Sequence, residues 1–286
     1  MSEKNPPPVD READFGDDVI SVDDVAREAS RIARERVSIQ RLAELAGGKP
    51  LLAIEDLRAG YGEMEILHGV HLQVASGQSL CLIGPNGAGK STVLHSIYGF
   101  THIYSGAIRV NGSDITRLTA NEKLRRARIA YVLQDNSVFP DMTVEENLWM
   151  GGYLMANPEQ AREAAERVFQ KYTRLAERRK QLARVLSGGE RRLLEIARAL
   201  VMEPRILLVD EPSIGLEPRY IEMVFEILAD LQRGEGKAII MVEQNAKKGL
   251  EFADIGYLLV SGSIVMADTG HNLLKHPDVE RLFLGG

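Results

Sequence analysis

Cysteine is nearly absent from this sequence of 286 residues, which contains only Cys81. A single thiol can form neither an internal disulfide nor a metal site built from several cysteines. Cys81 lies within a short apolar run, so we expect a small buried side chain without a redox role. Apolar runs of the ~18–20 residues that a membrane-spanning helix needs are also missing. Any role at a membrane must therefore come through partner proteins.

The sequence also lacks an excess of positive charge. Its formal net charge is -6 at pH 7, which argues against a protein whose main task is to bind the nucleic acid backbone. The N-terminus has no basic stretch followed by an apolar core, so we expect no secretory signal and a cytoplasmic chain. The residues that are present, 44% hydrophobic and 27% charged, are typical of a soluble globular protein.

Residues 1–49 differ in composition from the rest of the chain. Three consecutive prolines at 6–8 and several acidic residues predict a disordered start. Residues 21–33 then show a helical pattern with an alanine-rich face, and the segment closes at Gly47 and Gly48. We therefore expect an N-terminal extension over residues 1–49, with a disordered start plus a helix, and a separate domain over residues 50–286. The extension either makes a specific contact or is solvated and without a specific function.

Short apolar runs alternate with longer helical patterns in the second part of the chain. Residues 80–83, 129–133, 206–209 and 238–242 are each suited to a strand that is buried on both faces. The helical patterns between several of them predict βαβ connections and a largely parallel sheet, hence an α/β fold. Residues 141–200 are helical in pattern throughout, which predicts an inserted helical subdomain.

A glycine-rich segment after the first of these strands fits the pattern G-x-x-x-x-G-K-[ST]. Its glycines let successive backbone N–H groups point at a phosphate, and the following helix presents its positive N-terminal end to the same anion. Lys90 would place a charge on the β- and γ-phosphate oxygens, and the Ser91 hydroxyl suits Mg²⁺. The predicted phosphate loop comprises Gly84, Pro85, Asn86, Gly87, Ala88, Gly89, Lys90, Ser91 and the next residue, Thr92.

Two acidic residues follow the apolar run at 206–209. We expect the strand to deliver Asp210 to the same edge of the sheet as the phosphate loop, where it can hold Mg²⁺. Glu211 comes next and is the natural general base for an attacking water. Together with the phosphate loop, this pair predicts ATP hydrolysis with Mg²⁺ as the metal.

A second anion site is predicted at Ser187, Gly188, Gly189 and Glu190, which open a long helical run. Serine, two glycines and a helix N-terminus present N–H donors suited to phosphate. Because the chain already has one phosphate loop, a second cradle implies a γ-phosphate that is shared between two subunits.

With these motifs, residues 51–286 resemble an ABC-type ATPase subunit. The resemblance implies a P-loop NTPase (RecA-like) core with an antiparallel β edge and an inserted α-helical subdomain. It also implies two subunits that pair head to tail around two ATP molecules, each site joining one phosphate loop to the other chain's 187–190 signature. Tyr61 matches the aromatic that stacks on adenine, and Gln134 matches the glutamine that touches Mg²⁺ and faces the membrane partner. Residues 213–217 match the D-loop, which lies between the two paired chains.

Gln244 departs from the family pattern. The family usually has a histidine here, after the strand at 238–242, where it contacts the γ-phosphate. A glutamine can donate a hydrogen bond to a phosphate oxygen but cannot become cationic. We therefore expect Glu211, Gln244 and Lys90 to carry catalysis, and Ser91, Gln134 and Asp210 to hold the metal, with weaker charge stabilisation from Gln244. Glu217 also stands where aspartate is common.

The segments around Gln244 and the D-loop are similar to the second ATPase subunit of branched-chain amino acid importers, whose relatives import urea and short amides. The likeness implies a second ATPase subunit, either identical or, as the subfamily favours, different. It also implies transmembrane permease subunits and, indirectly, a periplasmic substrate-binding protein. The chain would lie on the cytoplasmic face of the inner membrane.

Two other classes of function stay open at this point. An ABC ATPase that acts on nucleic acid or ribosomes would have fused ATPase domains, a coiled-coil insertion or zinc cysteines, and the sequence has none of these. A regulatory nucleotide switch with little hydrolysis is disfavoured by Lys90, Asp210 and Glu211 but fits the glutamine at 244. The sequence does not identify the transported substrate, because the ATPase subunit never touches it.

Overall fold

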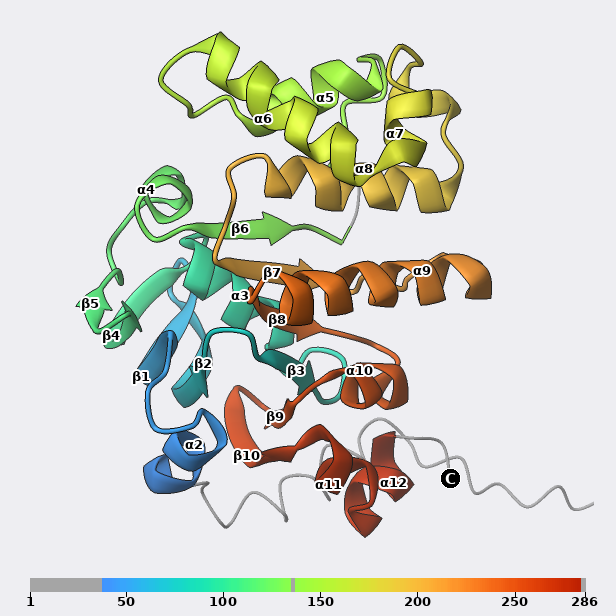
Figure 1. Ribbon diagram of the computed structural model, residues 1–286. Coiled ribbons are helices and arrows are strands. Elements are labelled where there is room, and N and C mark those ends of the chain that lie inside the picture. The colour runs from blue at the N-terminus through green and yellow to red at the C-terminus, as the bar shows by residue number, and fades with distance from the viewer. Residues whose placement is uncertain (1–37, 135–136, 284–286) are drawn as a thin grey trace, which may run out of the picture.

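The computed structural model describes residues 38–134 and 137–283. Two β-sheets lie against each other, and helices cover the larger sheet on both faces (Figure 1). The disordered start and the helix predicted within residues 21–33 lie outside the described residues.

The larger sheet has six strands in the order β10-β9-β3-β8-β7-β6. Its strands are β3 (Ser79–Ile83), β6 (Ile129–Val132), β7 (Ile206–Asp210), β8 (Ala238–Val242), β9 (Ile255–Val260) and β10 (Ser263–Thr269). Strands β9, β3, β8, β7 and β6 run parallel to one another, and β10 pairs antiparallel with β9 at the edge of the sheet. Every residue of β3, β7, β8 and β9 is buried, as expected for strands covered on both faces. The four predicted strands are thus confirmed.

Alternate residues of these strands point to opposite faces of the sheet and pack in two separate hydrophobic clusters. Cys81 and Ile83 of β3 point into a cluster with the helices that follow β6, whereas Leu80 and Leu82 point toward α3 (Lys90–Tyr98) and the smaller sheet. This alternation follows from the two-residue period of a strand. The other helices of this core are α4 (Ala120–Arg125), α9 (Pro218–Ala229) with its π-helical turn η2 (Asp230–Gly234), α10 (Ala246–Phe252), α11 (Gly270–Leu274) and α12 (Pro277–Phe283).

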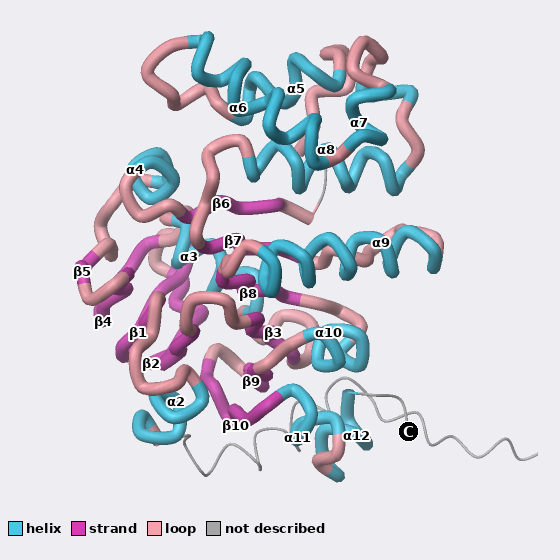
Figure 2. Tube along the Cα trace, viewed as in Figure 1, coloured by secondary structure: helices cyan, strands magenta, loops and turns pink. Residues whose placement is uncertain are grey.

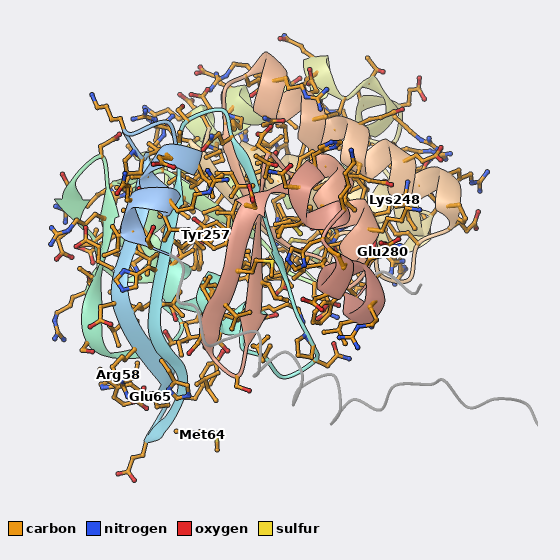
Figure 3. All side chains as sticks on the ribbon, turned by 90° about the horizontal axis from the view of Figure 1, so that it is seen from below. Arg58, Met64, Glu65, Lys248, Tyr257 and Glu280 are labelled. Atoms are coloured by element: carbon orange, nitrogen blue, oxygen red, sulfur yellow. The ribbon has the colours of Figure 1, made fainter. Side chains whose placement is uncertain are left out.

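The smaller sheet is antiparallel, in the order β2-β1-β4-β5. Its strands are β1 (Leu52–Tyr61), β2 (Met64–Val74), β4 (His102–Val110) and β5 (Ser113–Asp114). The hairpin of β1 and β2 extends to a tip where Arg58 pairs with Glu65 at 2.7 Å (Figure 3). Nearer the core, the Tyr257 hydroxyl of β9 accepts from Gln73 N at 3.1 Å, which links the two sheets.

A group of helices lies beside the β6 edge of the larger sheet (Figures 1 and 2). It comprises α5 (Val144–Gly151), α6 (Pro158–Lys171), α7 (Thr173–Glu177), the short 3-10 helix η1 (Ala183–Val185) and α8 (Gly188–Leu200). Every element described between residues 141 and 200 is helical, as the pattern predicts. α8 packs on both α5 and β6, so it joins this group to the sheet.

Helix α2 (Ile39–Leu45) docks on the core beside β2 and β10. Leu42 is buried in the same cluster as β1 and β2, and Arg41 pairs with Asp268 of β10 at 2.7 Å. Gln78 Nε2 also donates to the carbonyl of Leu45 at 2.9 Å. The end of the predicted extension therefore makes a specific contact rather than lying free in solvent.

Candidate nucleotide-binding site

The phosphate loop connects β3 to α3. Gly84 has a φ of +146°, and a Cβ there would lie 2.1 Å from the carbonyl oxygen of Leu259, so only glycine lets the loop pass so close to β9. Gly89 caps α3 in the left-handed conformation. The carbonyl of Ala88 accepts from Gly262 N at 2.9 Å, which fixes the loop against the β9–β10 turn. Asn86 and Gly87 are exposed, whereas Thr92 is buried in the first turn of α3.

Lys90 lies over its own loop. Its Nζ donates to the carbonyls of Gly84 at 2.9 Å and Pro85 at 3.0 Å. Burial lowers the pKa of the Lys90 ammonium, and the carboxylates of Glu211 and Asp210 oppose that shift. Lys90 is therefore within electrostatic reach of Asp210, the last residue of β7, and of Glu211, which follows it.

Asp210 is held by two hydroxyl groups from different elements. Ser91 Oγ donates to its Oδ1 at 3.1 Å, and the hydroxyl of Tyr131 in β6 donates to its Oδ2 at 2.8 Å. Burial raises the pKa of Tyr131 well above its usual range, and Asp210 adds to that effect, so the hydroxyl stays protonated and acts as a donor. Both oxygens of the buried carboxylate are thus oriented by their neighbours.

Glu211 has a positive φ of 43°, a conformation that non-glycine residues adopt rarely and that recurs at functional sites. Its backbone N–H donates to the carbonyl of Val242 at 2.9 Å. The side-chain amide of Gln134 donates to Glu211 Oε2 at 3.0 Å. The structure therefore brings together, at the carboxyl ends of β3, β6 and β7, the residues Gln134, Asp210, Glu211, Lys90 and Ser91.

The oxygen donors at this point suit a magnesium ion. Mg²⁺ prefers hard oxygen ligands, and the Ser91 hydroxyl, the Asp210 carboxylate and the Gln134 amide oxygen are all of this kind. Ser91 and Asp210 already approach within 3.1 Å of each other. These residues fit the ion, although the set differs from a cage of several carboxylates.

Tyr61 lies at the end of β1, beside α3. Its hydroxyl is 2.5 Å from Nδ1 of His95, and the two rings meet edge to face. His95 in turn contacts the ring of Tyr131. The predicted adenine-stacking residue is thus connected through His95 to the helix that starts at Lys90, with its ring partly exposed.

The signature residues open α8 at a different place. Ser187 and Glu190 form a capping box, in which Ser187 Oγ accepts from Glu190 N at 3.3 Å and Glu190 Oε2 accepts from Ser187 N at 3.0 Å. Arg174 and Arg178 also lie within ion-pair distance of Glu190. Among the described residues, no hydrogen bond or ion pair joins 187–190 to the phosphate loop of the same chain.

The two signature glycines differ in their surroundings. A Cβ on Gly189 would lie 2.0 Å from Cδ1 of Tyr220, whereas one on Gly188 would lie 3.6 Å from Leu216. Tyr220 belongs to α9, so the signature packs directly on the helix that follows residues 213–217.

Gln244 lies on the loop between β8 and α10, and it is exposed. The residue before it, Glu243, is buried and accepts hydrogen bonds from Ser213 and Asn245. The loop that carries Gln244 is thereby connected to the segment that follows Glu211.

Arg192 is a further site residue, and sequence reasoning missed it. Its guanidinium donates to the carbonyls of Leu133 at 2.8 Å and Asp210 at 3.0 Å, and to the carboxylate of Glu195 at 2.7 Å. It therefore joins α8 to the strand ends that carry Gln134 and Glu211. A charged pair three residues apart on the otherwise apolar face of α8 was the available signal. Sequence reasoning also missed Tyr131 and Glu243. Their signal was weaker, since each is simply a polar residue that lies in an apolar strand or directly after one.

Within the described part of the chain, every helix is too short or too polar to cross a membrane.

The chain matches the family model described as "ABC transporter" over residues 67–214. It is 42% identical to the "High-affinity branched-chain amino acid transport ATP-binding protein BraG" of Pseudomonas aeruginosa, over 82% of this chain and 100% of that protein. It is 32% identical to the "Lipopolysaccharide export system ATP-binding protein LptB" of Haemophilus influenzae, over 82% of this chain and 97% of that protein.

Solved structures resemble it as well. An ATP-binding cassette of an ABC transporter in its ADP conformation superposes with a TM-score of 0.74 at 28% identity, over 83% of this chain and 99% of that chain. These comparisons confirm the predicted fold class and the binding of a nucleotide.

Proposed function

This chain belongs to the ABC transporter family of ATP-hydrolysing subunits, and we propose that it is the motor of an importer for branched-chain or related amino acids. The observation that carries the catalytic part is the placement of Glu211. Its carboxylate accepts from Gln134 at 3.0 Å, directly after the carboxylate that Ser91 of the phosphate loop contacts. A base therefore stands next to the position where the γ-phosphate of a bound ATP would lie.

In the proposed reaction, the backbone N–H groups of the phosphate loop and the Lys90 ammonium hold the phosphates. Glu211 accepts the proton of the attacking water, and Gln134 orients the Glu211 carboxylate. Asp210 is itself oriented by Tyr131 and Ser91. Gln244 would donate a hydrogen bond to a γ-phosphate oxygen without adding a positive charge.

Mg²⁺ bound by Ser91, Asp210 and Gln134 would neutralise charge that develops on the phosphate oxygens. The Tyr131 hydroxyl donates a hydrogen bond to Asp210 Oδ2, so the other carboxylate oxygen, Oδ1, lies beside the Ser91 hydroxyl where the ion would bind. This division of the two carboxylate oxygens supports the proposed metal site.

A second ATPase subunit would complete the site. The signature residues 187–190 make no hydrogen bond with the phosphate loop of their own chain in the described residues, and Gly188 is exposed. This geometry supports a head-to-tail dimer in which each signature faces the other chain's ATP. The exposed glutamine at 244 favours a different chain as the partner, one that supplies the usual histidine.

Transmembrane permease subunits would dock beside Gln134 on the helical group. Phe139 and Met150 are large apolar side chains exposed there. The buried Asn147 braces the first of them, accepting from Phe139 N at 2.8 Å and donating to its carbonyl at 3.0 Å. The chain would therefore lie on the cytoplasmic face of the inner membrane and meet a periplasmic substrate-binding protein only indirectly.

Identity to the two relatives supports amino acid transport over lipopolysaccharide export. The chain is 42% identical to the amino acid transport protein and 32% identical to the lipopolysaccharide export protein. We therefore favour import of branched-chain or related amino acids, with urea or short amides as the alternative substrates.

The test is an uptake assay in source cells whose gene for this chain is replaced by the wild type or by Glu211→Gln. We expect uptake of radiolabelled leucine, isoleucine and valine with the wild type only, and unchanged urea uptake in both strains. Loss of urea uptake alone in the variant would favour the alternative substrates. Equal uptake of every compound in the two strains would overturn the importer proposal.

A further inference from the structure

Glu243 is a buried carboxylate that the mechanism above does not use. It follows β8 directly, and only 2% of the residue is exposed. None of the ion pairs found in residues 38–134 and 137–283 includes it. A buried carboxylate is costly unless hydrogen bonds compensate for the lost water, so its partners should be specific.

The carboxylate accepts three hydrogen bonds from two loops. Its Oε1 accepts from Ser213 Oγ at 2.7 Å and from Asn245 N at 2.9 Å. Its Oε2 lies 3.3 Å from Ser213 N. One loop is the segment after Glu211, which carries Ser213, and the other is Glu243's own loop, in which Asn245 follows Gln244.

The stem of Glu243 is confined by α10. A Cβ on Gly249 would lie 3.1 Å from the Glu243 Cβ and 2.6 Å from the Cys81 sulfur, so glycine lets the helix pack tightly here. Packing against α10 therefore fixes the side-chain stem of Glu243, while its carboxylate accepts hydrogen bonds from Ser213 and Asn245.

We propose that Glu243 is a positioning residue that couples the loop of Glu211 to the loop of Gln244. This rests on the proposed function, in which those two residues act on the attacking water and the γ-phosphate. Ser213 begins the segment 213–217, which would reach the partner's site. A displacement of Gln244 at the γ-phosphate is thus passed through Glu243 to Ser213, and so toward the second ATP.

A glutamate carboxylate is better suited to connecting the two loops than a glutamine or an aspartate side chain would be. Three donors meet two acceptor oxygens, whereas a glutamine has one acceptor oxygen and would turn an N–H donor toward one of the three. Aspartate keeps the charge but is one methylene shorter. Glu243→Gln should therefore weaken the coupling without changing the volume of the side chain.

Amide hydrogen exchange on the full chain without nucleotide tests the coupling directly. Ser213→Ala removes one donor from the first loop, and we expect faster exchange, by about tenfold, in the peptide that contains Asn245 on the other loop. Glu243→Gln should accelerate exchange in both peptides, and Glu251→Gln on the exposed face of α10 should change neither. Exchange confined to the mutated loop in Ser213→Ala would overturn the proposal.

The ATPase rate supplies a second, kinetic arm. Displacement of a base by about 1 Å can lower kcat by about 100-fold, so we expect Ser213→Ala and Glu243→Gln each to lower kcat by 10- to 100-fold with KM for ATP unchanged. The double variant should be no slower than the slower single variant, because both remove one connection. Multiplied losses in the double variant, or a raised KM with a lowered melting temperature in all three, would contradict a positioning role.

The two arms separate this inference from the proposed function. If Glu211→Gln hydrolyses ATP as fast as the wild type, the catalytic assignment fails, while the exchange experiment still decides whether Glu243 joins the loops.

Discussion

Lys123 illustrates, at the scale of one residue, how burial changes the chemistry of a side chain. It is fully buried in α4, and its Nζ donates to the carbonyl of Ser96 at 3.2 Å. Burial lowers the pKa of Lys123 to about 8, against a smaller opposing effect of Asp114. The folded state therefore binds fewer protons than the unfolded state between pH 8 and roughly pH 10.4.

The sign of the pH dependence follows from that difference. Stability rises with pH across this window, and the cost of burying a charged amine is fully present below about pH 8. We expect Lys123→Met to be more stable than the wild type at pH 7 by roughly 2 kcal/mol, after subtraction of the lost hydrogen bond. Urea unfolding at pH 7.0, 8.5 and 9.5 measures this advantage, which should shrink as the pH rises. A constant difference would contradict the assignment.

Gly189 and Tyr220 provide a second residue-scale prediction. A Cβ at position 189 would lie 2.0 Å from the Tyr220 ring, so Gly189→Ala should lower the free energy of unfolding by about 1–3 kcal/mol. Gly188→Ala is the matched control, since its Cβ meets nothing closer than 3.6 Å. Tyr220→Ala combined with Gly189→Ala should recover part of the loss. The idea fails if both alanine variants at 188 and 189 unfold at the same denaturant concentration.

At the scale of elements, α2 shows what the N-terminal segment contributes to the fold. Leu42 is 1% exposed and Ile39 of the same helix is 59% exposed. We expect Leu42→Ala to destabilise the chain by about 2–4 kcal/mol, whereas Ile39→Ala changes stability by less than about 0.5 kcal/mol. Chemical denaturation of the two variants provides the measurement. Equal losses would mean that α2 does not pack as described.

The elements also show where sequence reasoning succeeds. Strands β3, β7 and β8 were predictable because all their residues except Asp210 at the end of β7 are apolar or small, and because a recognisable loop follows each strand. The phosphate loop, Asp210 and Glu211 were predictable for the same reason, since their chemistry is encoded in a continuous stretch. The contact of α2 was not, because its partners on β2 and β10 become neighbours only in the folded chain.

Arg192 and Glu243 escaped sequence reasoning for a related physical reason. Most of their partners are backbone groups of distant loops, such as the carbonyl of Leu133 or the N–H of Ser213. Every residue has these groups, so the sequence does not mark which of them will serve as acceptor or donor. Only the folded arrangement reveals that both residues connect α8, β7 and β8 at the site.

At the scale of the whole molecule, the proposed function assigns to the chain two halves of two different sites. The phosphate loop, Asp210 and Glu211 meet at the carboxyl ends of β3 and β7, whereas the signature opens α8 and packs on Tyr220. In the proposed head-to-tail pairing, two copies, or this chain and a related partner, would bring a signature to each phosphate loop. The glutamine at 244 favours the mixed assembly.

The steady-state ATPase rate of the purified chain tests the central claim, that Glu211 drives hydrolysis in this fold. It is measured for the wild type, Glu211→Gln, Gln244→His and the double variant, with ATP binding measured in parallel. We predict that Glu211→Gln lowers the rate at least about 100-fold while ATP still binds. We also predict that Gln244→His raises the rate and that the double variant is silent. A double variant as active as Gln244→His, or silence of all four chains with ATP bound, would contradict the account.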